Sequence, residues 1–438
     1  MSLLSRLSPV ATHLPWLIAG YFAAQVVIRV LISPTLGRDE AEQALLTQAL
    51  AWGYGPQPPL YTWLATIVFA IFGKGVFALS LLKNLLLGSA YLLTYAVARR
   101  ISGDRLVAAA AAASLLLIPQ IAWESQRALT HSNLVLFAMA FYTYTLLRVL
   151  DDGRWPCYLL LGVAFACGVL AKFNFPLIAI AMLLAALSIR NFRARILDRR
   201  FLLTAAVAAL LLWRPLVWIV ENMAATMQRA TKLTGVPTDS AAMNAAAGVW
   251  ELALSTLLYL LPLIPIYVAL LIRTASDRAP GAAERAYASL LARSIVIALA
   301  VCVPMIAVFQ VTQIKERWLQ PLLYAAPILA ALWLSWRASR ERLLAVVGIA
   351  MVFAILVTVM IPARTVLAPS IGRTNALNSP YHAFATQIRA AGFETGGILA
   401  SFNLLGGNLG LQFPESVVVT PEYPNFALPD GKPLLLVW

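Results

Sequence analysis

Charged side chains are scarce in this chain of 438 residues: they make up 12% of the sequence, whereas hydrophobic residues make up 61%. The mean hydropathy of +0.80 excludes an ordinary soluble globular protein. Cysteine is scarce as well, and its three residues (Cys157, Cys167 and Cys302) lie inside or beside apolar segments. Their spacing fits neither a disulfide framework nor a metal site, so we interpret them as packing residues.

Long stretches of alternating apolar and polar residues are absent, which argues against a membrane β-barrel. A repeat with a period of about 20–50 residues is absent too. The net charge of +14 would favour a nucleic-acid partner in a soluble protein. Here the basic residues are distributed among short loops between apolar segments, so no nucleic-acid partner is expected.

Apolar runs long enough to cross a bilayer core of roughly 30 Å recur along the chain. They predict an all-α polytopic membrane protein, and the first run lacks a small-residue cleavage site, so it is expected to be a retained helix. We expect about eleven spans, near residues 14–32, 75–98, 106–122, 132–150, 157–171, 173–189, 201–220, 250–272, 293–312, 318–335 and 343–362.

Four loops are rich in Lys and Arg: 98–105, 189–200, 272–293 and 336–342. Basic loops accumulate on the cytoplasmic side, and these four share a side only if an even number of spans separates them. The short apolar run 60–72 follows two prolines and is therefore interpreted as a helix in the outer interface rather than as a span. The amino terminus is then expected inside and the carboxyl end outside.

The last part of the chain, residues 363–438, differs from the membrane domain predicted for residues 1–362. "SPYHAFATQIRAAGF" is typical of a short amphipathic helix, and "GGILASF", "SVVVT" and "PLLLVW" are typical of buried strands. We therefore expect a small α/β domain on the outer face. The glycines of "LLGGNLG" are interpreted as turn residues and not as a phosphate-binding loop.

Three of only nineteen acidic residues lie together in the first outer loop, 33–74: Asp39, Glu40 and Glu42. They fall in the first turn of a predicted helix, 39–51, where the helix dipole stabilises negative charge. A solvated, well-capped interfacial helix explains them as well as a catalytic role does.

Other ionisable residues are predicted at the same outer ends of the spans: Glu124, Arg127 and His131 in one loop, Lys172 in another, and Lys315 and Arg317 in a third. Ionisable residues at membrane depth are costly and usually functional, although Lys315 alone is explained by interfacial anchoring. Acids can activate a hydroxyl nucleophile, and cations can hold a phosphate leaving group. Together they indicate a glycosyl- or phosphoryl-transfer site.

"DEAEQALLTQALAWGYGPQPPLYTWL" resembles the first outer loop of glycosyltransferase family 39 and its relatives, where an Asp-Glu pair opens a juxtamembrane helix. "LLAKFNFPL", "RPLVWIVEN" and "KERWLQPLLYAAPIL" are similar to later segments of this group, which includes protein mannosyltransferases and the aminoarabinose transferase of lipid A. The similarity covers roughly residues 15 to 335. It implies a GT-C fold with outer juxtamembrane helices.

The resemblance implies that Asp39 is the general base toward the acceptor and that Glu40 orients or supports it. Lys172 and Arg317 resemble positions that meet the donor phosphate, and we add Arg127 and Lys315 from their places in the outer loops. Residues expected to line the acceptor or substrate pocket are Glu42, Tyr61, Glu124, His131 and Asn174. Many relatives have an Asp where this chain has His131, which could ligate a divalent metal, relay a proton, meet phosphate or be a satisfied polar residue.

The resemblance therefore implies an inverting glycosyltransferase of the bacterial inner membrane, multi-pass and monomeric. Its donor would be a polyprenyl-phosphate sugar, and its acceptor a hydroxyl of lipid A, lipopolysaccharide core, another glycan or a protein on the periplasmic side. No cofactor is assigned from the sequence, and a divalent metal stays an alternative through His131. Two alternatives are a lipid transporter or flippase, which would place intramembrane charges in both halves, and a membrane scaffold without activity.

Overall fold

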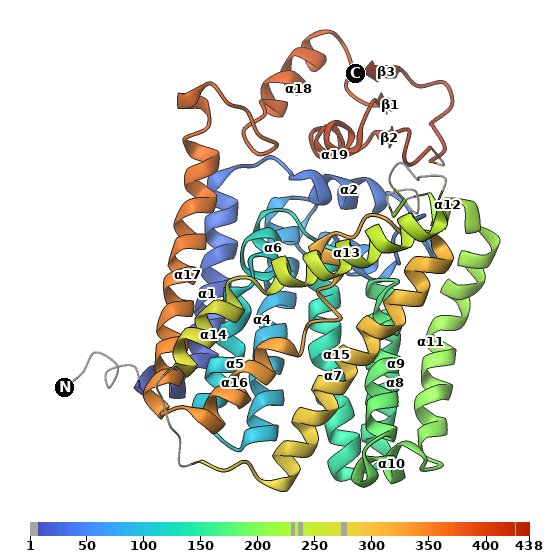
Figure 1. Ribbon diagram of the computed structural model, residues 1–438. Coiled ribbons are helices and arrows are strands. Elements are labelled where there is room, and N and C mark those ends of the chain that lie inside the picture. The colour runs from blue at the N-terminus through green and yellow to red at the C-terminus, as the bar shows by residue number, and fades with distance from the viewer. Residues whose placement is uncertain (1–7, 229–232, 235–239, 273–277, 425) are drawn as a thin grey trace.

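The computed structural model describes residues 8–228, 233–234, 240–272, 278–424 and 426–438. It is a bundle of long helices that carries a small α/β layer at one end (Figure 1). Within the described ranges, seven helices are long and apolar enough to cross a membrane, and two bent helix pairs bring the number to nine. The chain is thus a mostly helical, multi-pass membrane protein, as the sequence predicts.

The seven long helices correspond to predicted spans. They are α1 (Ser8–Ile32), α4 (Val76–Ser102), α7 (His131–Asp152), α11 (Phe201–Glu221), α13 (Ala241–Leu260), α15 (Ala282–Phe309) and α17 (Arg340–Val366). The short apolar run 60–72 forms a helix of its own, α3 (Leu60–Phe72), and its place in the outer interface stays a prediction.

The chain bends at two predicted spans. The first consists of α5 (Arg105–Ala113) with a 3-10 turn (Ser114–Leu117), then a π-helical turn (Gln120–Glu124) and α6 (Ser125–Arg127), with a bend of 75°. Pro119 lies at this bend, where it cannot donate a helical hydrogen bond. The second bend lies at the end of a predicted span: α9 (Phe175–Leu187) fills the span predicted at 173–189, and the chain then turns by 119° into α10 (Arg190–Ile196), within the predicted basic loop.

The other predicted spans match the sequence-based bounds to different degrees. α8 (Trp155–Ala171) agrees with the span predicted at 157–171 to within two residues. The span predicted at 318–335, by contrast, becomes α-helical only in α16 (Ala326–Arg337), because residues 320–325 form turns. The span predicted at 250–272 is divided between α13 and α14 (Leu263–Leu271) at Pro262, which cannot continue a helix. Figure 1 shows both pieces running obliquely across the bundle.

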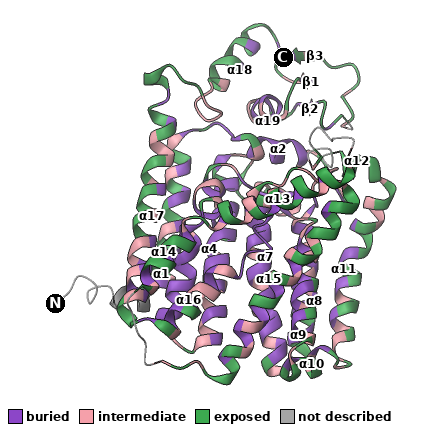
Figure 2. Cartoon of the chain, in the orientation of Figure 1, coloured by how far each residue is buried: buried purple, intermediate pink, exposed green. Residues whose placement is uncertain are grey.

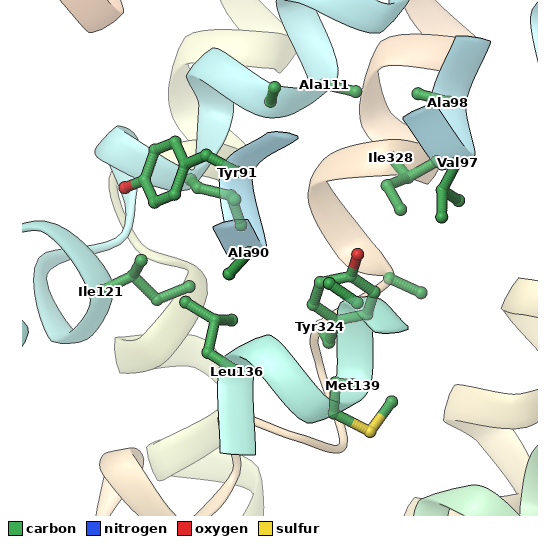
Figure 3. Packing of buried hydrophobic residues seen from close by; sticks show 14 of the residues in the cluster. Ala90, Tyr91, Val97, Ala98, Ala111, Ile121, Leu136, Met139, Tyr324 and Ile328 are labelled. Atoms are coloured by element: carbon green, nitrogen blue, oxygen red, sulfur yellow. The ribbon is translucent and has the colours of Figure 1, made fainter. Parts of the chain in front are cut away.

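The buried residues concentrate in the centre of the bundle (Figure 2). Many of them are alanines, among them Ala90, Ala98 and Ala111 in Figure 3, and such small side chains allow helices to pack closely. The alanines 108–113 of α5 are each at most 4% exposed. Tyr324 fills space beside α4, and its hydroxyl is 2.9 Å from that of Thr94. Large apolar residues at the periphery stay exposed instead, for example Leu210 at 75% and Val308 at 73%, as expected for a surface that faces lipid.

The basic loops meet at one end of the bundle. Arg340 pairs with Asp104 at 2.6 Å, and Arg278 donates to the Ser335 hydroxyl at 2.6 Å and to the Ser102 carbonyl at 3.2 Å. Figure 1 places α10 at the same end, whereas α2 (Arg38–Leu46), α6 and the C-terminal sheet lie at the opposite end. The acidic loop and the basic loops are therefore on opposite sides, as the charge pattern predicts.

The predicted C-terminal strands form a parallel sheet in the order β2-β1-β3, from β1 (Gly397–Ala400), β2 (Val417–Val419) and β3 (Leu434–Val437). Gly397 is in register with Val417 and with Leu434. The predicted amphipathic helix is α18 (Tyr381–Ala390). The turn expected at "LLGGNLG" was wrong, because this segment lies within a helix, α19 (Asn403–Gln412). Its glycines are required by close packing rather than by a turn.

Candidate active site

Helix α2 begins at Arg38, after its N-cap residue Gly37, and the buried carboxylate of Glu40 caps its first turn. Glu40 accepts a hydrogen bond from the backbone N–H of Gly37 at 2.8 Å, which satisfies one free donor of the first turn. The same carboxylate lies 2.6 Å from the Arg29 guanidinium of α1 and 3.6 Å from the Lys83 ammonium of α4. Two spans therefore anchor the start of α2.

Burial opposes the ionisation of Glu40, but the charges of Arg29 and Lys83 and the hydrogen bonds from Arg29 and Gly37 outweigh it. Together they lower the pKa of Glu40 to about 2. Glu40 is 4% exposed, so its charge is compensated by the protein rather than by water. Glu40 thus holds the first turn of α2, which also contains Asp39, and its supporting role toward Asp39 stays a prediction.

Asp39 is the half-buried neighbour of Glu40, and its charge acts on Lys172. Lys172 ends α8, and its ammonium donates to the Ser132 hydroxyl at 3.0 Å and to the Arg317 carbonyl at 3.3 Å. Burial and then the charge of Arg317 lower the pKa of Lys172 to about 7, whereas Asp39 acts in the opposite direction. The three loops that carry these residues thus converge.

The segment before α16 brings Arg317 to this point. Asn174 donates its amide to the Trp318 carbonyl at 2.6 Å, and Gln320 donates to the Ser132 carbonyl at 3.0 Å. The Arg317 side chain is exposed, and its charge is close enough to depress the pKa of Lys172. Lys172 and Arg317 repel each other, so an anion bound between them would stabilise both charges. The exposed Arg317 side chain leaves such an anion access from solvent.

His131 lies at the first turn of α7 and is 5% exposed. Its Nε2 is 3.3 Å from the side-chain nitrogen of Gln43, and its ring centroid is 5.5 Å from that of Tyr61. Tyr61 itself is 1% exposed. The structure thus brings the predicted pocket residues Tyr61 and His131 together, and the buried Tyr61 ring packs beside the imidazole.

Other predicted residues lie nearer the rim. Arg127 is exposed and pairs with Glu124 at 2.6 Å, and Lys315 is exposed as well. The described residues contain no group of three or more His, Cys, Asp or Glu that could hold a metal ion. The roles assigned to all these side chains, and the metal hypothesis for His131, stay predictions.

The C-terminal domain docks directly onto α2. Asn408 of α19 makes two hydrogen bonds to the Leu36 backbone, accepting from its N–H at 2.8 Å and donating to its carbonyl at 3.2 Å. Tyr423 donates to the Glu42 carboxylate at 2.6 Å. Gln48 at the end of α2 forms a matching pair with the backbone of Val418, at 2.9 and 2.8 Å. Glu42 thus binds this domain.

Sequence reasoning missed these partners of α2. Asn408 and Tyr423 are single polar residues more than 360 positions after α2, and no local spacing connects them to it. The glycines of α19 were the available signal: a Cβ on Gly407 would lie 2.3 Å from the Ala41 carbonyl oxygen. A glycine inside a helix often marks a close approach of another backbone.

Comparisons with known proteins identify the class of protein as a GT-C membrane glycosyltransferase. Residues 56–219 match the family model described as dolichyl-phosphate-mannose-protein mannosyltransferase. The chain is 35% identical over 430 residues to the lipopolysaccharide core galacturonosyltransferase RgtB of Rhizobium johnstonii, covering 96% of this chain and 86% of RgtB. It is 32% identical to RgtA of the same organism, with coverages of 96% and 85%.

Among solved structures, ArnT from Cupriavidus metallidurans bound to undecaprenyl phosphate has the same fold. Its TM-score is 0.62 at 15% identity, covering 96% of this chain and 86% of ArnT. The chain belongs to the family of GT-C glycosyltransferases that contains RgtA and RgtB.

Proposed function

We propose that this glycosyltransferase moves galacturonic acid from a polyprenyl-phosphate donor to a hydroxyl of the lipopolysaccharide core. The sugar and the acceptor are those in the names of RgtA and RgtB. The lipid-phosphate donor is supported by the undecaprenyl phosphate bound to ArnT. The observation that supports the proposal is the contact between the loops of Lys172 and Arg317, where the Lys172 ammonium donates to the Arg317 carbonyl at 3.3 Å. The charge of Asp39 also acts on Lys172.

In the proposed reaction, Asp39 takes the proton of the acceptor hydroxyl as its oxygen attacks the anomeric carbon of the sugar. The bond between that carbon and the phosphate oxygen breaks, and the lipid phosphate leaves with the electron pair. Lys172 and Arg317 stabilise the charge of the leaving phosphate. Glu40 keeps α2 in place through Arg29 and Lys83. A single displacement of this kind inverts the anomeric configuration.

The proposed location is the bacterial inner membrane, with the reaction on the periplasmic side and the amino terminus in the cytoplasm. The support is the grouping of the basic loops at the end opposite α2 (Figure 1), together with the positive-inside rule. The prenyl tail would enter between the helices from the bilayer.

The test is transfer by the purified full chain in lipid nanodiscs, from synthetic polyprenyl-phosphate galacturonate to deacylated core oligosaccharide. Asp39→Asn should lower kcat at least 100-fold, the size of a lost general base. Asp430→Asn, an exposed acid of the C-terminal domain, is the matched control. If the Asp39→Asn variant transfers sugar at the wild-type rate, Asp39 is not the base. Movement of intact donor across vesicles without release of lipid phosphate would favour the flippase alternative.

A further inference from the structure

A buried chain of three polar side chains connects α3, α2 and α7. The Thr62 hydroxyl donates to the Gln43 side-chain oxygen at 2.8 Å, and the Gln43 nitrogen lies 3.3 Å from Nε2 of His131. Thr62 and Gln43 are both 0% exposed. Water therefore has little access to substitute for either contact, and each polar atom depends on its protein partner.

The direction of these hydrogen bonds follows from the orientation of the Gln43 amide in the structure. When the Thr62 hydroxyl donates to the amide oxygen of Gln43, the amide nitrogen must face His131, and an amide NH₂ can only donate. Nε2 of His131 is then the acceptor and carries no proton. In the reversed amide, the Gln43 nitrogen would donate to the Thr62 hydroxyl oxygen, and Nε2–H of His131 would donate to the Gln43 oxygen. The position of the His131 proton therefore distinguishes the two arrangements. The tautomer of a histidine is set by such a bond at one ring nitrogen.

We propose that Gln43, itself oriented by Thr62, is a positioning residue that holds His131 as a neutral imidazole with its proton on Nδ1. His131 then contributes one N–H donor and no positive charge. Its Nε2 lone pair is occupied by Gln43, so neither phosphate nor a metal ion meets His131 through that atom. This assignment selects one state among the alternatives that the sequence leaves open for His131.

The residues around His131 explain why a neutral imidazole is useful at this position. Asp39 lies one helical turn before Gln43 on α2, and Lys172 is bonded to Ser132, the residue after His131. Tyr61 covers the ring from α3. With His131 neutral, the positive charge of the site stays with Lys172 and Arg317. An additional imidazolium would compete with them for Asp39 and for the donor phosphate.

The test is ¹⁵N NMR of the full chain, selectively labelled at histidine, at a pH where imidazole is neutral. The chain contains only three histidines, and His13 and His382 are exposed, so they serve as internal references. His131→Asn assigns the third signal. We expect the references to carry the proton mainly on Nε2, as free histidine does, and His131 to carry it on Nδ1. A protonated Nε2 at His131 overturns the proposal.

Two variants test whether the Thr62–Gln43–His131 hydrogen bonds set the tautomer of His131. Thr62→Val removes the hydroxyl that orients Gln43, and Gln43→Leu removes the donor itself. Either change should let a protonated Nε2 appear at His131. Thr66→Val, one turn further along α3, is the matched control, because the Thr66 hydroxyl bonds only its own helix at the Thr62 carbonyl. An unchanged His131 spectrum in both folded variants overturns the role of Gln43.

The kinetic consequence rests on the proposed function. Both variants should lower kcat about tenfold, the scale of one lost hydrogen bond, with a donor KM within twofold of wild type. The NMR result needs no transfer activity, so failure of the tautomer assignment and failure of the proposed reaction are distinguishable. Gln43→Glu, whose carboxylate would accept from Nε2–H, should give the Nε2-protonated spectrum.

Discussion

Replacing Gly407 by alanine perturbs α2 from α19, which carries none of the residues proposed to act on the substrates. The new Cβ would lie 2.3 Å from the Ala41 carbonyl oxygen and 2.6 Å from its Cα, whereas ordinary contact begins at 3.4 Å. The obstacle is backbone and cannot rotate away. Helices α19 and α2 must therefore separate by about 1 Å, the shortfall from ordinary contact.

The separation reaches Asp39 because this residue precedes Ala41 by two positions in the same short helix. A displacement of about 1 Å at a reacting group can cost about 100-fold in rate, which corresponds to about 2.7 kcal/mol of transition-state stabilisation. We therefore expect Gly407→Ala to lower kcat about 100-fold. Donor KM should change little, because Lys172 and Arg317 lie on other elements.

The measurement is steady-state transfer by the purified full chain, with thermal unfolding recorded in parallel to establish that the variant is folded. Gly20→Ala in α1 is the control, since its Cβ would meet nothing within 4 Å. A folded Gly407→Ala variant with kcat within threefold of wild type would refute the reasoning that docking of α19 positions the acid.

Three further changes have distinct signatures. Glu40→Gln should destabilise the fold by about 3 kcal/mol at neutral pH, because the pKa of Glu40 is lowered from 4.5 to about 2. Thermal unfolding at a series of pH values should show the stability difference between wild type and variant disappearing as the pH falls from 4.5 toward 2. Lys172→Arg should abolish the rise in donor KM that we expect as wild-type Lys172 deprotonates above about pH 7, since arginine stays charged. Tyr423→Phe should lower the unfolding free energy by about 1–3 kcal/mol in denaturant titrations, whereas an unchanged midpoint would show that the bond to Glu42 contributes nothing.

Local patterns in the sequence were sufficient to predict most helices. Apolar runs and the charges between them predicted the long spans and the interfacial helix α3. The bounds failed where proline intervenes: Pro119 bends one span, and Pro262 divides another. Proline acts locally, so its presence was visible, but whether it kinks a helix or ends it depends on what packs around it.

The same limit applies to the site. The acids of α2 and the cations of the later loops were recognisable as ionisable residues in an apolar chain, and this was sufficient to indicate a transfer site. Glu40 appeared as one carboxylate among three, and only the folded chain brings Arg29 and Lys83 to it from two spans. Likewise, the helix of "LLGGNLG" could be recognised only with α2 packed against it.

The sequence by itself determined the class of molecule, because hydropathy and charge act on each segment independently of the others. Tertiary structure alone decided which carboxylate is locked in an ion pair, which cations meet, and which ring nitrogen of His131 is occupied. These properties depend on distances of a few ångströms between residues that are tens to hundreds of positions apart. Coulomb energies and hydrogen bonds vary steeply over such distances, whereas a linear sequence carries no record of them.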